Sequence, residues 1–203
     1  FMMDVPTIED VRAAAKRIEA IAVRTPLVRN DALDAALGAK VFVKAENLQR
    51  GGAFKFRGAC NAVWSLDAST AARGVVTHSS GNHGAALALA AQTRGISAHV
   101  VVPEGAVKSK LAAIEAYGAT LHFCAPTMAA REAKAESVRA QTGAELVHPF
   151  ADLRVIAGQG TAALELARSG AKLGAVVAFH AGLSSPTPDD ASKIQGKVLA
   201  LHG

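Results

Sequence analysis

The residue best suited to covalent chemistry is a lysine that follows a pair of glycines. Residues 51–59 read GGAFKFRGA, which places Lys55 between Phe54 and Phe56. Two aromatic neighbours would partly desolvate the amine, and desolvation disfavours the ammonium form. A neutral lysine can attack an aldehyde to form a Schiff base. The alternative is a solvated lysine at the start of a helix, which is the ordinary environment of lysines.

A second segment has the composition of an anion site. Residues 77–84 read THSSGNHG, after an expected strand and before an expected helix. Backbone N–H groups at such a junction bind anions, and small residues let a ligand approach closely. A carboxylate or a phosphate would fit. The alternative is an ordinary helix start, in which Ser79 or Ser80 caps the first turn and His83 lies on the surface.

Both segments fall within a pattern of alternating strands and helices. Strands are expected at 74–78, 98–102, 119–123 and 145–148, with helical stretches between them. This alternation, about every 23 residues, predicts a parallel sheet covered on both faces, which is an α/β fold of three layers. Upstream, Thr7 and Asp10 have the spacing of a capping box for an amphipathic helix. Residues 40–45 alternate as a strand does, and Lys55, after the two glycines, is expected near the start of a helix.

Composition excludes several classes of function. The chain has 203 residues and a formal net charge of +5, but its 22 lysines and arginines are scattered and form no basic stripe, so we expect no nucleic-acid partner. No apolar run is long enough for a membrane helix, so no membrane partner is expected. Cys60 and Cys124 have the spacing neither of a metal site nor of a disulfide framework, so no metal is expected and a reducing cytoplasm is the expected location.

Taken together, the two segments and their surroundings resemble the fold-type II pyridoxal-phosphate enzymes of the serine racemase and threonine dehydratase family. The resemblance covers roughly residues 5 to 177. Further matching stretches are KAENLQ at 44–49, VPE at 102–104 with Lys110, Gly118-Ala119, and IAGQGT at 156–161.

The resemblance implies roles for the residues of both segments. Lys55 would hold pyridoxal 5'-phosphate as a Schiff base, Phe54 would pack beside the pyridoxal ring, and Asn82 would hydrogen-bond its phenolic oxygen. The backbone of the loop would bind the carboxylate of a small amino-acid substrate, at Ser79, Ser80, Gly81, Asn82 and His83. The implied fold is a flavodoxin-like small lobe at 51–149, with residues 1–50 and 150–203 forming part of a larger lobe.

Ser80 bears on the type of reaction. Racemases of the family resemble this chain in having a serine there, whereas the dehydratases usually have alanine. A hydroxyl opposite Lys55 offers the second acid/base group that protonation from both sides requires. The resemblance therefore favours serine racemisation, with β-elimination of water as a companion reaction, over simple deamination of threonine.

The chain departs from the family pattern at two places. Ala53 stands where serine is common. The family's run of four glycines, which binds the cofactor phosphate, is replaced by FHAGL at 179–183. Phenylalanine, histidine and leucine are poor substitutes in a loop that must aim several N–H groups at one anion, so we expect cofactor binding to be weak or lost. The sequence also stops before the rest of the larger lobe.

Residues 175–203 have a second resemblance, to a fragment of a dienelactone hydrolase. No G-x-S-x-G motif lies upstream to supply a nucleophile. Three hypotheses follow: a pyridoxal-phosphate racemase or dehydratase completed by homodimerisation, a hybrid or truncated chain that keeps the fold and little activity, and an esterase of the α/β-hydrolase type. Visible absorbance of bound cofactor separates the first two, and ester turnover sensitive to thiol reagents would indicate the third.

Overall fold

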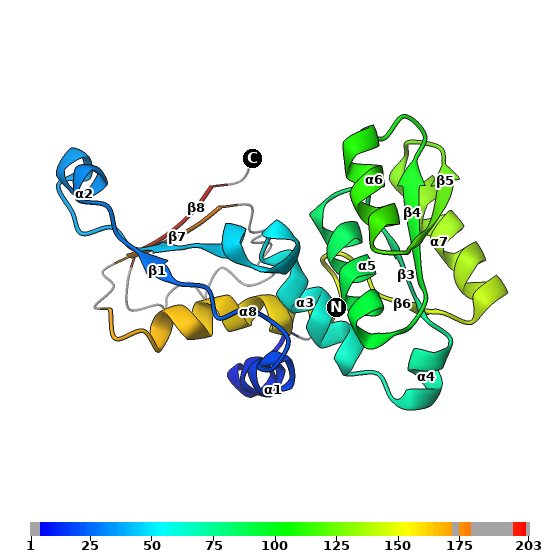
Figure 1. The fold of residues 1–203 in the computed structure, drawn as a ribbon, viewed down its shortest axis with the longest axis horizontal. Coiled ribbons are helices and arrows are strands. Elements are labelled where there is room, and N and C mark those ends of the chain that lie inside the picture. The colour runs from blue at the N-terminus through cyan, green and yellow to red at the C-terminus, as the bar shows by residue number, and fades with distance from the viewer. Residues whose placement is uncertain (1–4, 172–174, 180–196, 202–203) are drawn as a thin grey trace.

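The computed structural model describes residues 5–171, 175–179 and 197–201, and its path is shown in Figure 1. The α-helices are α1 (Ile8–Ile18), α2 (Asp31–Leu37), α3 (Lys55–Trp64), α4 (Ala68–Ala72), α5 (Asn82–Arg94), α6 (Lys108–Ala116), α7 (Met128–Thr142) and α8 (Leu153–Ala167). The strands are β1 (Leu27–Val28), β2 (Val43–Lys44), β3 (Val75–His78), β4 (Ala98–Pro103), β5 (Thr120–Cys124), β6 (Glu145–Leu146), β7 (Ala175–Phe179) and β8 (Lys197–Leu201). Two 3-10 turns, η1 (Glu46–Leu48) and η2 (Arg50–Gly52), lead into α3.

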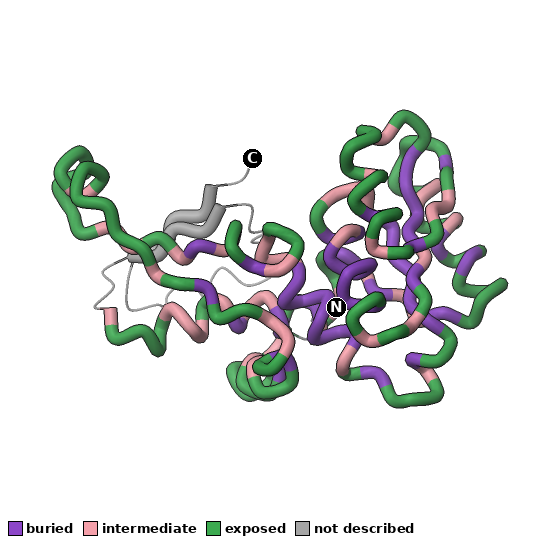
Figure 2. The backbone as a smooth tube through the Cα atoms, in the orientation of Figure 1, coloured by how far each residue is buried: buried purple, intermediate pink, exposed green. Residues whose placement is uncertain are grey.

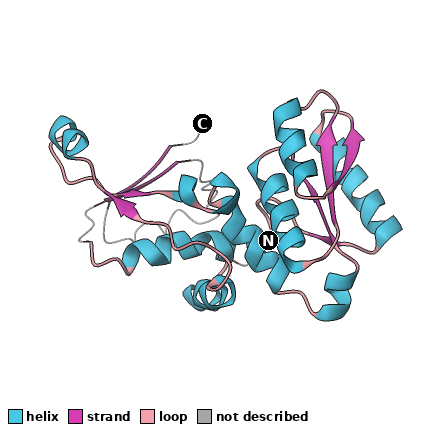
Figure 3. Ribbon diagram, viewed as in Figure 1, coloured by secondary structure: helices cyan, strands magenta, loops and turns pink. Residues whose placement is uncertain are grey.

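A parallel sheet of four strands in the order β5-β4-β3-β6 organises the lobe drawn at the right of Figure 1. The two other sheets are pairs: β1 with β2, antiparallel, and β7 with β8, parallel. Figure 3 shows helices on both sides of the four-stranded sheet. The predicted α/β class with a parallel sheet is therefore confirmed.

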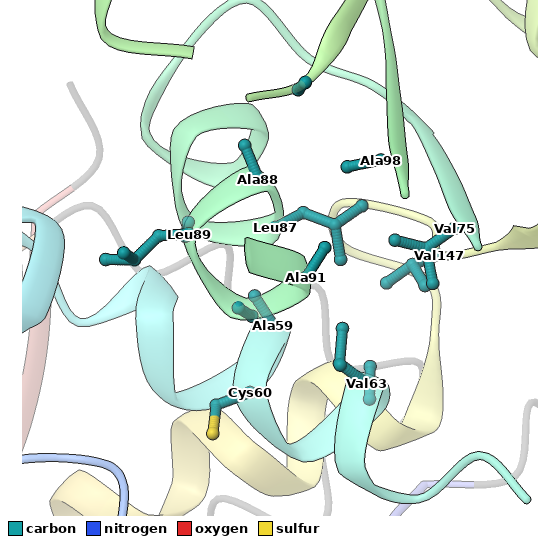
Figure 4. Close-up of a cluster of buried hydrophobic side chains, with 14 of the residues drawn as sticks. Ala59, Cys60, Val63, Val75, Leu87, Ala88, Leu89, Ala91, Ala98 and Val147 are labelled. Carbon is teal, nitrogen blue, oxygen red and sulfur yellow. The ribbon is translucent and has the colours of Figure 1, made fainter. Parts of the chain in front are cut away.

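Each face of the sheet has its own hydrophobic core. Alternate strand residues point to opposite faces. Val75 and Val100 pack with residues of α3, α5 and α6, whereas Val76 and Val101 pack against α7. Figure 4 shows the first cluster, to which α3 contributes Ala59, Cys60 and Val63 and α5 contributes Leu87, Ala88 and Ala91.

Helix α3 lies between the sheet lobe and the rest of the chain. It packs against α5 on one side and against α8 on the other. Gly58 and Gly158 meet where α3 crosses α8, and a Cβ added to Gly158 would come 2.6 Å from the Gly58 Cα. Figure 2 shows buried residues along α3, α5 and the sheet, whereas α2 contains no buried residue.

The structure corrects several expected element boundaries. The strand expected at 40–45 is only Val43–Lys44, because its partner β1 is two residues long. The strand expected at 145–148 ends at Leu146. The capping box of α1 is confirmed, with the Thr7 side chain accepting from the Asp10 N–H and the Asp10 carboxylate accepting from the Thr7 N–H. None of the helices within the described residues is long and apolar enough to cross a membrane.

Candidate active site

The order of the strands identifies the edge of the sheet at which a ligand would bind. From β3 the chain proceeds to β4 and β5 on one side, and then returns to place β6 on the other side of β3. In open α/β sheets, ligands bind beyond the carboxyl ends of the strands where the strand order reverses. That position lies at the ends of β3 and β6. The loop after β3 is the serine loop, Ser79–Gly81.

Lys55 is the first residue of α3, as the sequence predicted. Its side chain is half-buried, and burial lowers the pKa of its amine below the usual value. The Nζ atom lies 5.2 Å from the centre of the Phe54 ring. A larger share of this amine is therefore neutral at a given pH than in a solvated lysine, which favours attack on a carbonyl carbon.

Arg57 fixes the opposite side of the same helix. Residues two apart in a helix point in nearly opposite directions. The Arg57 guanidinium is 1% exposed and forms ion pairs with Glu46, at 2.8 Å from Nε to Oε2, and with Glu165, at 2.7 Å from Nη1 to Oε1. Lys44 Nζ contacts Glu165 Oε2 at 2.6 Å. The first turn of α3, which carries Lys55, is thus tied to α8 and to η1.

The serine loop leads into α5 without a side-chain cap. Gly81 is the N-cap residue, and neither Ser79 nor Ser80 accepts a hydrogen bond from the first turn of the helix. Instead, the Ser79 hydroxyl accepts from the Gly81 N–H at 3.4 Å, within the loop. The alternative of an ordinary serine cap is therefore wrong. Uncapped N–H groups at the start of a thirteen-residue helix suit an anionic ligand.

Gly84 allows the loop to fold back against the helix. A Cβ atom added there would lie 2.0 Å from the Ser79 carbonyl oxygen. Only glycine permits this approach, because real Cβ contacts do not come so close. The glycine that ends the segment THSSGNHG thus sets the position of the two serines.

His83 is buried, so the alternative in which His83 lies on the surface is wrong. It is 3% exposed, and neither ring nitrogen has a hydrogen-bond partner of good geometry among the described residues. Burial, and then the charge of Lys55, lower the pKa of the imidazole to about 3. His83 is therefore neutral at physiological pH, and Lys55 lies near enough for its charge to disfavour protonation of the ring.

The remaining predicted residues occupy the same two helix starts. Phe54 is the residue before α3, and Asn82 is the first residue of α5. Ser79, Ser80 and Gly81 are partly exposed, and Asn82 is exposed to solvent. Because α3 and α5 pack against each other, both predicted segments lead into one helix pair. Their individual roles stay predictions.

The sequence did not single out a cluster of titratable groups beside the serine loop. His78 ends β3, His148 follows β6, and Glu132 lies in α7, with one ligand atom of each within 4.8 Å of the others. The His78 and His148 rings meet edge to face, with centroids 4.8 Å apart. The available signal was that both histidines follow apolar strands, whose carboxyl ends share one edge of a parallel sheet.

The hydrogen bonds of His148 argue against a metal at this cluster. Its Nδ1 accepts from the backbone N–H groups of Phe150 and Ala151, at 3.3 and 3.0 Å. Nδ1 is thus unprotonated and engaged, so the neutral ring carries its proton on Nε2. A metal bound at Nε2 would require that proton to leave or to move onto the engaged nitrogen. The cluster therefore suits hydrogen bonding better than metal ligation.

The residues present do fit an aldehyde cofactor and an acidic substrate group. A half-buried amine of lowered pKa offers the covalent attachment, and the uncapped helix N-terminus offers the anion site. Two expectations fall mainly outside the described residues. The replacement of the glycine run lies at 179–183, of which only Phe179 is described, and the stretch that resembles a dienelactone hydrolase is described only at β7 and β8.

Comparisons with known proteins agree with this geometry. A family model described as "Pyridoxal-phosphate dependent enzyme" matches residues 18–184. A serine racemase of Arabidopsis thaliana is 50% identical over 215 aligned positions, covering 94% of this chain and 65% of the relative. A beta-hydroxyaspartate dehydratase of Paracoccus denitrificans is 48% identical, covering 87% of this chain and 56% of the relative. The crystal structure of serine racemase from Dictyostelium discoideum superposes with a TM-score of 0.86 at 44% identity, covering 97% of this chain and 65% of that one.

The chain thus spans between 56% and 65% of the length of these relatives. The match nevertheless includes both helix starts, the parallel sheet and α8. The chain belongs to the family of pyridoxal-phosphate dependent enzymes.

Proposed function

We propose that this chain carries the cofactor lysine and the substrate-carboxylate loop of an enzyme that racemises small hydroxy amino acids and eliminates water from them. The observation that carries the proposal is that Lys55 and the serine loop lie at the starts of two packed helices, with Lys55 near enough to His83 in the second helix to lower the pKa of the His83 ring after burial. The serine loop also follows β3, where the strand order reverses. Relatives named serine racemase and beta-hydroxyaspartate dehydratase support this substrate class.

The proposed roles follow the chemistry of each residue. Lys55 would hold the cofactor and move a proton at the substrate α-carbon, Phe54 would pack beside the pyridoxal ring, and Asn82 would hydrogen-bond its phenolic oxygen. The backbone from Ser79 to His83 binds the substrate carboxylate. When bound, pyridoxal phosphate supplies the electron sink that makes the α-proton acidic.

Ser80 is the proposed second acid/base group. Racemisation requires a proton to leave one side of the α-carbon and another to arrive on the opposite side. Lys55 serves one side. A partly exposed hydroxyl in the loop opposite serves the other, which supports racemisation as well as elimination.

The proposal extends to the organisation of the chain. Residues 51–149 would form the small lobe, residues 1–50 and 150–203 part of the larger lobe, and the working enzyme would be a homodimer. The packing of α3 between α5 and α8 supports a division near this helix. Cys60 and Cys124 are both buried free thiols, which supports a reducing compartment such as the cytoplasm.

Covalent trapping of the cofactor tests the assignment of Lys55. The chain would be incubated with pyridoxal phosphate, reduced with borohydride, digested and analysed by mass spectrometry. We expect the added mass on the peptide that contains Lys55, and its loss in Lys55→Ala. Lys108→Ala is the matched control, because Lys108 is an exposed lysine of α6. Label spread evenly over exposed lysines, and unchanged in Lys55→Ala, would contradict the proposal.

A further inference from the structure

A pair of histidines on the four-stranded sheet plays no part in the proposed reaction. His99 is in β4 and His122 is in β5, two adjacent parallel strands (Figure 1). His99 Nδ1 lies 3.1 Å from His122 Nε2, and the ring centroids are 5.3 Å apart. The two rings therefore face each other through one nitrogen each.

The strand register explains this approach. His99 lies opposite Thr120, and His122 lies opposite Val101, so the two histidines are diagonal neighbours. Each histidine lies two residues before a strand residue that packs against α7, namely Val101 in β4 and Cys124 in β5. Both histidines are therefore on the face of the sheet that α7 covers. The ladder between β4 and β5 holds the two backbones, so little rearrangement is needed to bring the rings together.

The distance suits a metal chelate as well as a hydrogen bond. Imidazole nitrogens bind Zn²⁺ at about 2.0–2.1 Å, so two nitrogens 3.1 Å apart would enclose an angle of roughly 100° at the metal. This angle lies between the right angle of a tetragonal Cu²⁺ or Ni²⁺ site and the tetrahedral angle of Zn²⁺. A widening of a few tenths of an ångström would reach the latter.

The protonation of the rings is also compatible with a metal. Burial lowers the pKa of both His99 and His122, which favours the neutral form of the ring that a metal binds. Their hydrogen bond requires a proton on one of the two facing nitrogens. Transfer of that proton to the far nitrogen of the same ring frees both lone pairs without charging either ring. This differs from His148, whose Nδ1 is engaged by two backbone N–H groups.

The surroundings limit the class of ligand. Among the described residues, no third histidine, cysteine or carboxylate joins this pair in a metal-binding group. The Cys124 thiol, on the same face, donates to the Val102 carbonyl oxygen at 3.5 Å. Both rings are partly exposed, so water can fill the remaining positions. Hard cations such as Mg²⁺ and Ca²⁺ prefer oxygen ligands and are not expected here.

We propose that His99 and His122 form a two-histidine site for a divalent late transition metal, with Cu²⁺ bound more tightly than Ni²⁺ or Zn²⁺. The order follows the general affinities of these ions for nitrogen ligands. The bound ion joins β5, the edge strand of the sheet, to β4.

Titration of the chelator-treated full chain with CuCl2, NiCl2 or ZnCl2 tests the site by calorimetry, with the electron paramagnetic resonance of Cu²⁺ reporting the number of bound nitrogens. We expect two nitrogen ligands in the parent chain. His99→Ala and His122→Ala should each weaken binding by roughly a hundredfold, the scale expected when a linked second ligand is lost. MgCl2 should neither bind nor compete.

Glu132→Gln is the matched control, because it removes a carboxylate from the competing cluster of His78, Glu132 and His148. Binding should stay unchanged in that variant. Metal affinity that persists within about twofold in both alanine variants, or that disappears in Glu132→Gln, would overturn the proposal. If an alanine variant fails to fold, His99→Gln and His122→Gln keep a side chain of similar size and give the same comparison.

Discussion

Arg57 and Glu165 form a two-pronged ion pair in which Nη1 contacts Oε1 at 2.7 Å and Nη2 contacts Oε2 at 3.0 Å. The pair joins α3 to α8 through two residues that are 108 positions apart in the chain. Such fork-to-fork geometry fixes direction as well as distance. The ion pair therefore fixes the rotation of α3 about its own axis. Because Lys55 lies two residues before Arg57 in this helix, the direction of its side chain is fixed as well.

Arg57→Leu should be strongly destabilising. It removes the cation that both Glu46 and Glu165 contact and leaves two partly buried carboxylates without it. Breaking one side of a buried ion pair typically costs about 3–5 kcal/mol. Urea unfolding would measure the loss. Arg139→Leu is the control, because the Arg139–Glu136 pair is exposed, and its loss should cost no more than about 1 kcal/mol. Equal losses in the two variants would refute the anchoring role.

Gly158→Ala should separate α3 from α8. The new Cβ would meet the Arg57 carbonyl oxygen and the Gly58 Cα, both at 2.6 Å, and neither backbone can move without shifting a helix. Overpacking of this kind costs about 1–3 kcal/mol. At Gly160 the nearest atom is a methyl group of Val11 at 2.9 Å, which can rotate away. The midpoint of thermal unfolding should therefore be well below that of the parent for Gly158→Ala and lower than that of Gly160→Ala. The reverse order of the two midpoints would show that α3 and α8 are not tightly packed at this crossing.

Ser80→Ala should suppress racemisation more than elimination. Delivery of a proton to the opposite side of the α-carbon needs a second acid/base group, whereas Lys55 alone can serve elimination. Loss of one such group typically costs about a hundredfold or more in rate. Both reactions would be followed on the same L-serine sample, by chiral chromatography for D-serine and by a pyruvate assay for elimination. Parallel losses in the two rates would rule out the two-base assignment.

His83 should make the fold sensitive to acid. Its pKa is about 3 in the folded chain, against a usual value near 6.5 for an exposed histidine. Between these values the unfolded chain binds a proton that the folded chain does not. The stabilisation is therefore complete above pH 6.5 and falls by about 1.4 kcal/mol per pH unit as the pH drops below it.

Urea unfolding at pH 7.5 and at pH 5 would measure this dependence. His83→Gln should reduce the difference between the two pH values by about 2 kcal/mol, since 1.5 pH units lie below the usual pKa. The other histidines of lowered pKa are common to both chains and cancel in the comparison. If the difference in stability between pH 7.5 and pH 5 is the same in the parent and in His83→Gln, His83 is protonated in the folded chain at pH 5.

The sequence predicted the elements whose signals are local. The capping box of Thr7 and Asp10, the apolar strands that became β3 to β5, and the place of Lys55 at a helix start all follow from neighbouring residues. The loop was also predicted, because THSSGNHG follows an apolar strand. The resemblance added the family, which the comparisons confirmed.

What the sequence missed depends on packing between distant segments. His83 is buried among groups from distant parts of the chain, since Lys55, Val147 and His148 all influence its pKa, and no neighbour of His83 in sequence signals this. Arg57 belongs to the segment GGAFKFRGA, but nothing in that segment indicates that its partner, Glu165, comes from α8. The meeting of His78 with His148 required the strand order, which places β6 beside β3 and not beside β5. Periodicity identifies a strand but carries no information about its neighbour.

The same strand order constrains the sequence of events as the chain leaves the ribosome. β3, β4 and β5 can pair in the order of their synthesis, but β3 stays an edge strand until Glu145–Leu146 has emerged, more than sixty residues later. Parallel pairing over such separations is slow, and chain synthesis proceeds at about 5–20 residues per second. The strand that carries the serine loop thus remains open on one side for several seconds. During this interval a chaperone, or another nascent chain, has access to its unpaired backbone.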